Sequence, residues 1–113
     1  MTEFVLRDYQ EVRHFLRICD ISLGNTRLYW SDSVAFGKYL PRANQIHISS
    51  ACKQGIIMWV VPCIVHELTH KLQRKRAGSL IAYYIGLSLF RWAWEKEAIA
   101  AEEEAERMLG IEL

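Results

Sequence analysis

Residues 62–76 read PCIVHELTHKLQRKR, and Gly78 follows two residues later. Pro62 suits the first turn of a helix, where a missing N–H costs nothing, and glycine suits the position just after the last turn. The stretch therefore predicts a helix over 62–76. Because residues four apart lie on one helix face, His66 and His70 point both imidazoles in the same direction.

The pair of histidines gains chemical meaning from Glu67, which stands between them in the pattern His-Glu-x-x-His. Two imidazoles on one face can bind a zinc ion, and Glu67 lies close enough to take a proton from a water held by that ion. A hydrolytic zinc site keeps three protein ligands and leaves the fourth position to water. The motif therefore favours a metal site over two locally hydrogen-bonded histidines, and it requires a third ligand elsewhere.

The third ligand is expected in a last helix, where 91–109 reads RWAWEKEAIAAEEEAERML. At about 100° per residue, Glu95 projects into a sector flanked by apolar residues. A carboxylate in such a sector needs a cation or a donor, so Glu95 is the preferred ligand. Glu102, on the same face, can instead be the ligand or a partner that orients a histidine. Glu97, on the opposite margin of the apolar stripe, is the remaining alternative.

The other histidines and two tyrosines are weaker candidates. His14 follows the polar side of the first predicted helix, and His47 sits on a predicted strand, where it would at most line a cleft. A lone histidine is more often satisfied locally than bound to a metal. Tyr83 and Tyr84 are available as transition-state donors, but tyrosines in an apolar helix usually belong to the core, so neither is assigned.

Taken together, these residues resemble a known family. HELTH, then a hydrophobic helix, then WEKEAIA (94–100) looks like the gluzincin metallopeptidases, in which a downstream helix supplies a glutamate as third ligand. The run from Glu95 to Ala98 matches their Glu-x-x-Ala motif. The short interval between His70 and Glu95 is most similar to the minigluzincins, and to small bacterial domains reading HELTHVWQ and later YExEA. The resemblance covers about 44–104.

The resemblance implies one zinc ion per chain, held by His66, His70 and Glu95, with Glu67 activating the water. It also implies that 44–50 is an edge strand along which an extended peptide aligns. The chain departs from the family at three positions. Many gluzincins have an acidic residue four places after the ligand glutamate, where this chain has Ile99; Lys71 and Arg74 replace apolar or aromatic residues. The role of orienting the first histidine therefore passes to another residue or is missing.

The remaining segments predict an α+β domain with a small zincin-like architecture. It would contain an N-terminal helix, a short sheet of two or three strands, the active-site helix and two more helices. Periodicity and residue type predict these elements: a helix over 3–19 capped by Thr2, a strand at 26–30, a loop at 31–42, a half-buried strand at 44–50 suited to an edge, a short helical stretch ending at 61 and capped by Ser49 or Ser50, a buried apolar helix at 79–91, and a helix at 92–109 stopped by Gly110.

Composition limits the class of protein. With 113 residues, 51% hydrophobic and 24% charged, the chain predicts a single globular domain spanning 1–113. The 14 Lys and Arg against 13 Asp and Glu give no general electrostatic signal for nucleic acid. KLQRKR (71–76) is a weak local signal for DNA, and EEEAE (102–106) is more typical of a solvated helix face.

Targeting and redox signals are few. No basic region followed by an apolar run opens the chain, so we expect a cytoplasmic protein, with delivery by a non-classical route still compatible with the sequence. Cys19, Cys52 and Cys63 have no paired spacing and predict buried reduced thiols. The apolar run 80–90 is shorter than the roughly 20 residues of a transmembrane span. A buried helix is its expected structure, and a membrane-contacting hairpin is the less favoured alternative.

The predicted function is hydrolysis of peptide bonds by a zinc metallopeptidase acting on a peptide or protein substrate. So short a chain is compatible with a regulatory partner, an activation step or an oligomer. The alternative is a catalytically silent, metal-stabilised interaction module of a larger secreted or phage-derived assembly, because zinc contributes folding free energy directly to small domains. Glu67 argues against that alternative, since a purely structural site needs no base.

Overall fold

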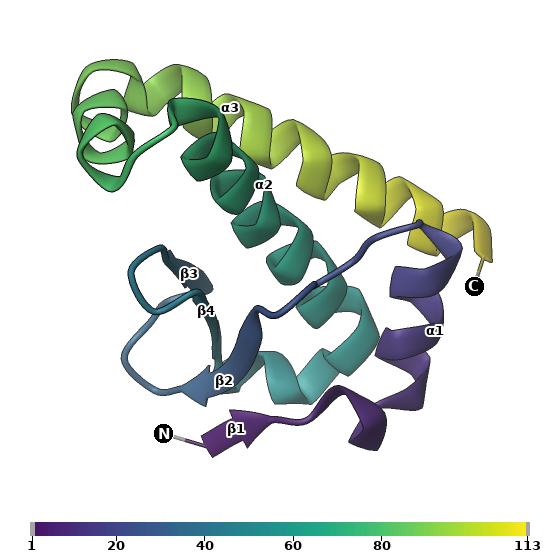
Figure 1. Ribbon diagram of the computed structural model, residues 1–113. Coiled ribbons are helices and arrows are strands. Elements are labelled where there is room, and N and C mark those ends of the chain that lie inside the picture. The colour runs from purple at the N-terminus through teal and green to yellow at the C-terminus, as the bar shows by residue number, and fades with distance from the viewer. Residues whose placement is uncertain (1, 113) are drawn as a thin grey trace.

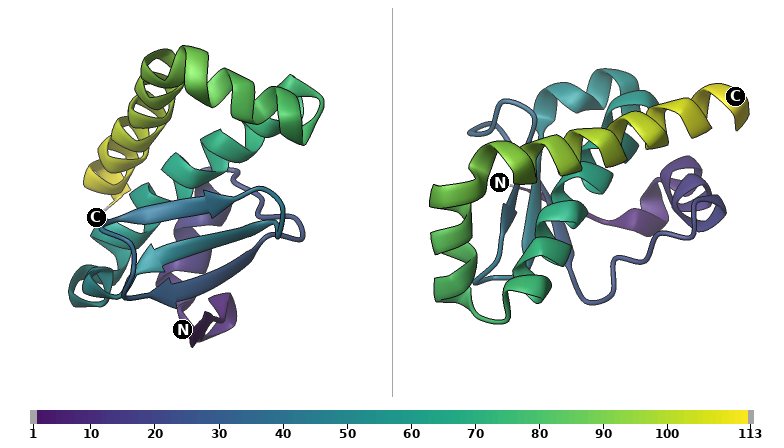
Figure 2. Two further views of the ribbon diagram at one scale, coloured as in Figure 1. Left: turned by 90° about the vertical axis from the view of Figure 1, so that its left-hand side faces the viewer. Right: turned by 90° about the horizontal axis from the view of Figure 1, so that it is seen from above.

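The computed structural model describes residues 2–112, which form an α+β domain (Figure 1). A four-stranded sheet makes one layer, and the helices lie on one side of it (Figure 2). The elements in chain order are β1 (Thr2–Phe4), a 3-10 turn (Leu6–Asp8), α1 (Gln10–Ile18), β2 (Arg27–Ser31), β3 (Gly37–Leu40), β4 (Gln45–Ser49), a 3-10 helix (Ser50–Gly55), a π-helical turn (Ile56–Val60), α2 (Val61–Ala77) and α3 (Leu80–Glu112).

The sheet has the order β1-β2-β4-β3, with a parallel β2–β4 pair between two antiparallel pairs. The strand expected at 44–50 is therefore β4, and it lies inside the sheet, so the expectation of an edge strand there is wrong. The two edge strands are β1 and β3, and β3, the neighbour of β4, falls within the segment predicted as a loop. The sequence pattern did not predict β3, because Tyr39 is the one residue of the four that is buried in the core. A single buried position gives no alternation of apolar and polar residues.

The hydrophobic core fills the space between the sheet and α2. Ile46 and Ile48 of β4 are fully buried, and they face Cys63 and Ile64 of α2 across one continuous cluster. The opposite face of the sheet carries half-buried and exposed residues such as Tyr29 and His47. One buried face and one wetter face explain the alternating pattern read from the sequence.

The N-terminal helix is shorter than expected. Instead of a helix over 3–19 capped by Thr2, the chain forms β1, a 3-10 turn and then α1. Phe4 pairs with Leu28 across the sheet. Its ring stacks on Tyr9 at 4.4 Å and contacts Trp30 at 5.0 Å between centroids. This aromatic contact with a distant strand overrides the local helical periodicity.

The helix that carries His66 and His70 agrees closely with its prediction. α2 begins one residue before Pro62 and ends at Ala77, and Gly78 caps it with a φ of 85°, in the left-handed region that glycine adopts readily. Together with the helical turns before it, the run Ser50–Ala77 is long and apolar enough to cross a membrane by length and composition alone. In the folded domain its inward side, including Val61 and Ile64, forms the core.

The two helices predicted after α2 are joined into α3, with a bend where Phe90 has φ −122° and ψ 24°. The part beyond the bend runs back along α2 (Figure 1). Gly110 does not stop this helix, which continues to Glu112. The part before the bend is not the buried helix we expected, since Ile81 is 74% and Leu89 70% exposed.

Candidate metal centre

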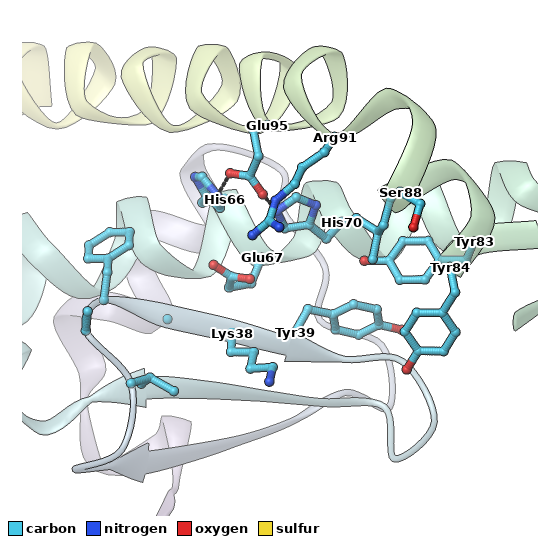
Figure 3. A pocket seen from close by; sticks show the side chains of 15 residues that line it. Lys38, Tyr39, His66, Glu67, His70, Tyr83, Tyr84, Ser88, Arg91 and Glu95 are labelled. Carbon is cyan, nitrogen blue, oxygen red and sulfur yellow. Dashed lines mark ion pairs between the residues drawn. The ribbon is translucent and has the colours of Figure 1, made fainter.

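α2 presents His66 and His70 toward α3, and both side chains are largely buried at 12% and 9% exposure. The bend at Phe90 brings the second part of α3 over the same face of α2, so Glu95 lies opposite the two histidines (Figure 3). The four-residue spacing on one helix places the two histidines together. The position of Glu95 near them depends instead on the bend within α3.

The three side chains converge on one point. Glu95 places one carboxylate oxygen 3.2 Å from Nε2 of His66 and the other 2.9 Å from Nε2 of His70. One ligand atom from each residue lies within 4.8 Å of the others. A tetrahedral zinc ion with bonds of about 2.0–2.1 Å separates its ligand atoms by roughly 3.3 Å. The group His66, His70 and Glu95 can therefore hold a metal ion.

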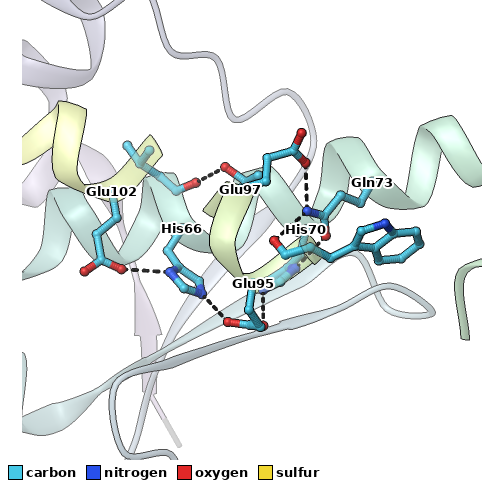
Figure 4. Close-up of polar contacts among 9 residues, drawn as sticks. His66, His70, Gln73, Glu95, Glu97 and Glu102 are labelled. Atoms are coloured by element: carbon cyan, nitrogen blue, oxygen red, sulfur yellow. Dashed lines mark hydrogen bonds and ion pairs between the residues drawn. The ribbon is translucent and has the colours of Figure 1, made fainter. Parts of the chain in front are cut away.

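The hydrogen bonds behind the histidines fix which ring nitrogen is available as a ligand (Figure 4). Nδ1 of His66 lies 2.7 Å from the Glu102 carboxylate, and Nδ1 of His70 lies 2.8 Å from Oε1 of Gln73. Both oxygens are acceptors, so each Nδ1 carries the proton and donates it. In the neutral rings this leaves the lone pair on Nε2, directed at the convergence point, as metal-bound histidines require.

The amide of Gln73 is oriented by its own partners. Its Nε2 donates to the backbone carbonyl of Trp94 at 2.9 Å and to Glu97 at 2.8 Å. Because both of these partners are acceptors, the amide nitrogen must face them. Oε1 then faces His70, so these hydrogen bonds determine the orientation of the amide. Glu97 also accepts from Arg76, and these bonds hold the pKa of Glu97 below its usual value.

Glu67 lies beside the convergence point and is only 4% exposed. Burial raises the pKa of this carboxyl, while the charges of His70 and His66 and a hydrogen bond from the Tyr39 backbone N–H oppose the rise. The strand bearing Tyr39 approaches so closely that a Cβ on Gly37 would lie 2.4 Å from the Cys63 sulfur and 3.3 Å from Glu67. Glycine at this position therefore lets β3 reach the site.

A cleft of about 940 Å³ opens in front of these residues, between β3 and α3 (Figure 3). Tyr83 and Arg91 reach into it from the two parts of α3. The Tyr83 ring stacks on Trp94 at 5.6 Å between centroids, and its hydroxyl end faces His70. Burial raises the pKa of Tyr83 to about 12, so its hydroxyl stays protonated near neutral pH.

The remaining sequence candidates lie away from this centre. His14 is exposed on α1. His47 points to the other face of the sheet, where it meets Gln45 and Tyr29, and it does not line the cleft. Lys71 donates to the Leu23 carbonyl at 3.1 Å and to the hydroxyl of Thr26, so it connects α2 to the loop before β2.

Sequence reasoning missed two residues of the site. Gln73 stands three places after His70 on the same helix face. This spacing predicts that the two side chains are close, but it does not predict the hydrogen bond between them. Gly37 lies within the segment predicted as a loop, where no role at the site was expected. The role of orienting His66, expected four places after the ligand glutamate, falls instead to Glu102, one of the two alternatives left open for that residue.

Comparison with known proteins adds no assignment: no family model, curated protein or solved structure matches this chain.

Proposed function

We propose that this protein is a zinc-dependent peptidase. The observation that carries the proposal is the convergence of His66, His70 and Glu95 on one point, next to the buried carboxylate of Glu67 and at the base of an open cleft. A structural zinc site usually closes all four positions with protein ligands. Three ligands, a neighbouring base and access for a substrate are the arrangement of a hydrolytic site.

Zinc is the proposed metal because two imidazoles and one carboxylate are a common catalytic donor set for that ion. The same set accepts other divalent ions, so the metal needs measurement. When bound, zinc polarises a carbonyl oxygen and lowers the pKa of a water molecule to about 7. Glu102 and Gln73 hold the two imidazoles in the tautomer that binds it.

Glu67 is the proposed general base. Its carboxylate is held in place by the Tyr39 backbone N–H and lies between the metal-binding face of α2 and the edge of the sheet. From there it can accept a proton from the attacking water and return it to the leaving amine. Its burial beside the proposed ligands keeps the carboxyl close to both the water and the leaving group.

Two further features suit a peptide substrate. Tyr83 offers a protonated hydroxyl on the wall of the cleft, and such a donor can stabilise the oxyanion that develops during attack. β3 is an edge strand along the same cleft, so an extended peptide can add to the sheet there. In this proposal β3 aligns the substrate peptide, a role that the resemblance had implied for 44–50.

The test begins with metal content, measured by mass spectrometry on purified wild type and on His66→Ala, Glu95→Ala and Glu67→Ala. About one zinc per chain is expected in wild type and in Glu67→Ala, with loss in the other two variants. Glu103→Ala is the matched control for Glu95→Ala, because Glu103 is an exposed glutamate on the same helix. Zinc retained in Glu95→Ala would show that the proposed ligand set is wrong.

Cleavage is then measured with a mixed peptide library. Wild-type protein loaded with zinc is expected to cleave it, and Glu67→Ala is expected to bind zinc without cleaving. Full loading of wild type without cleavage of any protein or peptide would argue against the peptidase and favour the metal-stabilised interaction module.

A further inference from the structure

The part of α3 before the bend leaves an apolar face uncovered. Ile81, Tyr84, Ile85 and Leu89 line one continuous surface together with Ser88. Each of the four is more than half exposed. We call these four residues the outer face. Large exposed apolar residues gathered on one helix mark a binding surface more often than scattered ones do.

The fold sets the orientation of the outer face, because the opposite side of the same helix packs on Trp94. Tyr83 is 3% exposed and stacks on Trp94. Gly86 lies so close to the Trp94 ring that a Cβ there would meet it at 2.2 Å. The helix therefore rests on Trp94 through these two residues, and its outer face points away from the domain.

The residues that follow the outer face are typical of a membrane interface. Phe90, at the bend, is 56% exposed and Trp92 is 76% exposed. The Lys96 ammonium lies 4.9 Å from the centroid of a Trp92 ring. Tryptophan beside lysine, next to an apolar helix face, matches the boundary between acyl chains and anionic headgroups.

The charged residues of 71–107 are separated by sign along the chain. Residues 71–96 contain six Lys and Arg and one acidic residue, Glu95, whereas 97–107 contain five Glu and one Arg. Glu95 is engaged by the two histidines. The basic part includes the end of α2 and the outer face, and the acidic part runs toward the far end of α3 (Figure 1). Two of the six cations have partners inside the domain, because Lys71 donates to Leu23 and Thr26 and Arg76 donates to Glu97. The other four, Arg74, Lys75, Arg91 and Lys96, flank the outer face in the sequence and would attract it to an anionic surface.

We propose that the outer face docks the protein on an anionic membrane surface, with the first part of α3 lying in the interface. A second copy of this chain fits less well, because pairing two outer faces would bring the basic ends of both copies together. A helix lying in the interface buries its apolar face by about 5–10 Å, and its neighbouring cations contact the headgroups.

Docking in this way would place the cleft at the membrane surface. Tyr84 and Ser88 line the cleft as well as the outer surface of the helix, so one rim of the cleft borders the docked face. The substrate class that follows is a polypeptide segment lying at or just outside a bilayer. This substrate class rests on the proposed peptidase function, whereas the docking does not.

The experiment is sedimentation of the whole chain with vesicles of phosphatidylcholine, alone or mixed with phosphatidylglycerol. We expect binding to the mixed vesicles, weaker binding to phosphatidylcholine alone, and loss of binding as salt is raised. The variant Ile81→Ser/Leu89→Ser should lower the partition coefficient roughly tenfold or more, because two apolar side chains leave the interface. Ile18→Ser/Leu72→Ser is the matched control, since it removes two exposed apolar residues elsewhere and should bind like wild type.

A second readout reports insertion. Brominated acyl chains should quench tryptophan fluorescence in wild type and quench it much less in Trp92→Phe. Absence of binding to the mixed vesicles, or equal binding by Ile81→Ser/Leu89→Ser, would overturn the proposal. A dimer that the same double variant abolishes, without vesicle binding, would assign the outer face to a second copy instead. None of these readouts needs peptidase activity, so docking and the proposed function can fail separately.

Discussion

Nδ1 of His66 lies 2.7 Å from the carboxylate of Glu102, while Nε2 of the same ring faces Glu95 at 3.2 Å. The two carboxylates stand seven residues apart, two turns of one helix, and hold one imidazole from both sides. Glu102 therefore fixes the tautomer of His66, and Glu95 occupies the position of a metal ligand. An exposed glutamate such as Glu103 has neither effect.

Glu102→Ala should weaken metal binding without abolishing it. Loss of the acceptor at Nδ1 lets the His66 ring rotate and change tautomer, and such a change typically costs about tenfold to a hundredfold in metal affinity. Competition with a zinc chelator measures the affinity. Glu103→Ala removes an exposed neighbour and should match wild type. Equal affinities for the two variants would mean that Glu102 does not orient the ring.

Gln73→Leu should destabilise the fold even in metal-free protein. Gln73 is 1% exposed and bonds to His70, Glu97 and the Trp94 carbonyl. The substitution keeps the volume but leaves buried polar groups unpaired, at about 1–3 kcal/mol. Urea unfolding in the presence of a chelator measures the change.

The control for this variant is Gln54→Leu at an exposed position, which should change the free energy of unfolding by less than about 0.5 kcal/mol. A Gln73→Leu protein as stable as wild type would contradict the network.

Gly37→Ala should strain the contact between β3 and α2. The new Cβ would lie 2.4 Å from the Cys63 sulfur, and overpacking of this kind costs about 1–3 kcal/mol. The double variant Gly37→Ala/Cys63→Ala removes the clashing atom. Its loss of stability should be smaller than the sum of the two single losses, which a double-mutant cycle measures.

Gly110→Ala serves as the glycine control, because no heavy atom lies within 4 Å of a Cβ there. Additive losses in the cycle would show that Gly37 and Cys63 do not press on each other.

Tyr83→Phe should lower the rate of peptide cleavage by about a hundredfold and leave zinc content unchanged. The hydroxyl faces the cleft, and the raised pKa of Tyr83, about 12, keeps it a donor at neutral pH. Turnover of a library substrate by zinc-loaded protein measures the effect. Tyr29→Phe, on the other face of the sheet, should keep wild-type turnover. A Tyr83→Phe enzyme of normal rate would exclude the hydroxyl as a donor.

Thiol reactivity should separate the three cysteines. Burial raises the pKa of the Cys63 and Cys52 thiols, so less reactive thiolate forms at pH 8 than in an exposed cysteine. Cys19 is only partly buried. Ellman's reagent should therefore react with Cys19 first in native protein and with all three after unfolding in guanidinium. Rapid reaction at Cys63 in the native state would contradict the close packing of β3 on α2.

Local sequence determined helix α2 and its histidine pair. Pro62 and Gly78 bound the helix by backbone chemistry, and the four-residue spacing places His66 and His70 on one face whatever surrounds them. Glu95 could be preferred because its place beside an apolar stripe is also set within one helix. These predictions needed only interactions between residues close in the chain.

Tertiary structure decided the rest. β3 packs closely on α2 because Gly37 fits against Cys63, and Phe4 joined the sheet through contacts with Trp30. Glu102 and Gln73 acquired their roles only when the bend at Phe90 laid α3 along α2. The same bend left the outer face exposed, although its composition suggested burial. Contacts between residues far apart in the chain depend on how helices and strands pack, and a local pattern does not contain that information.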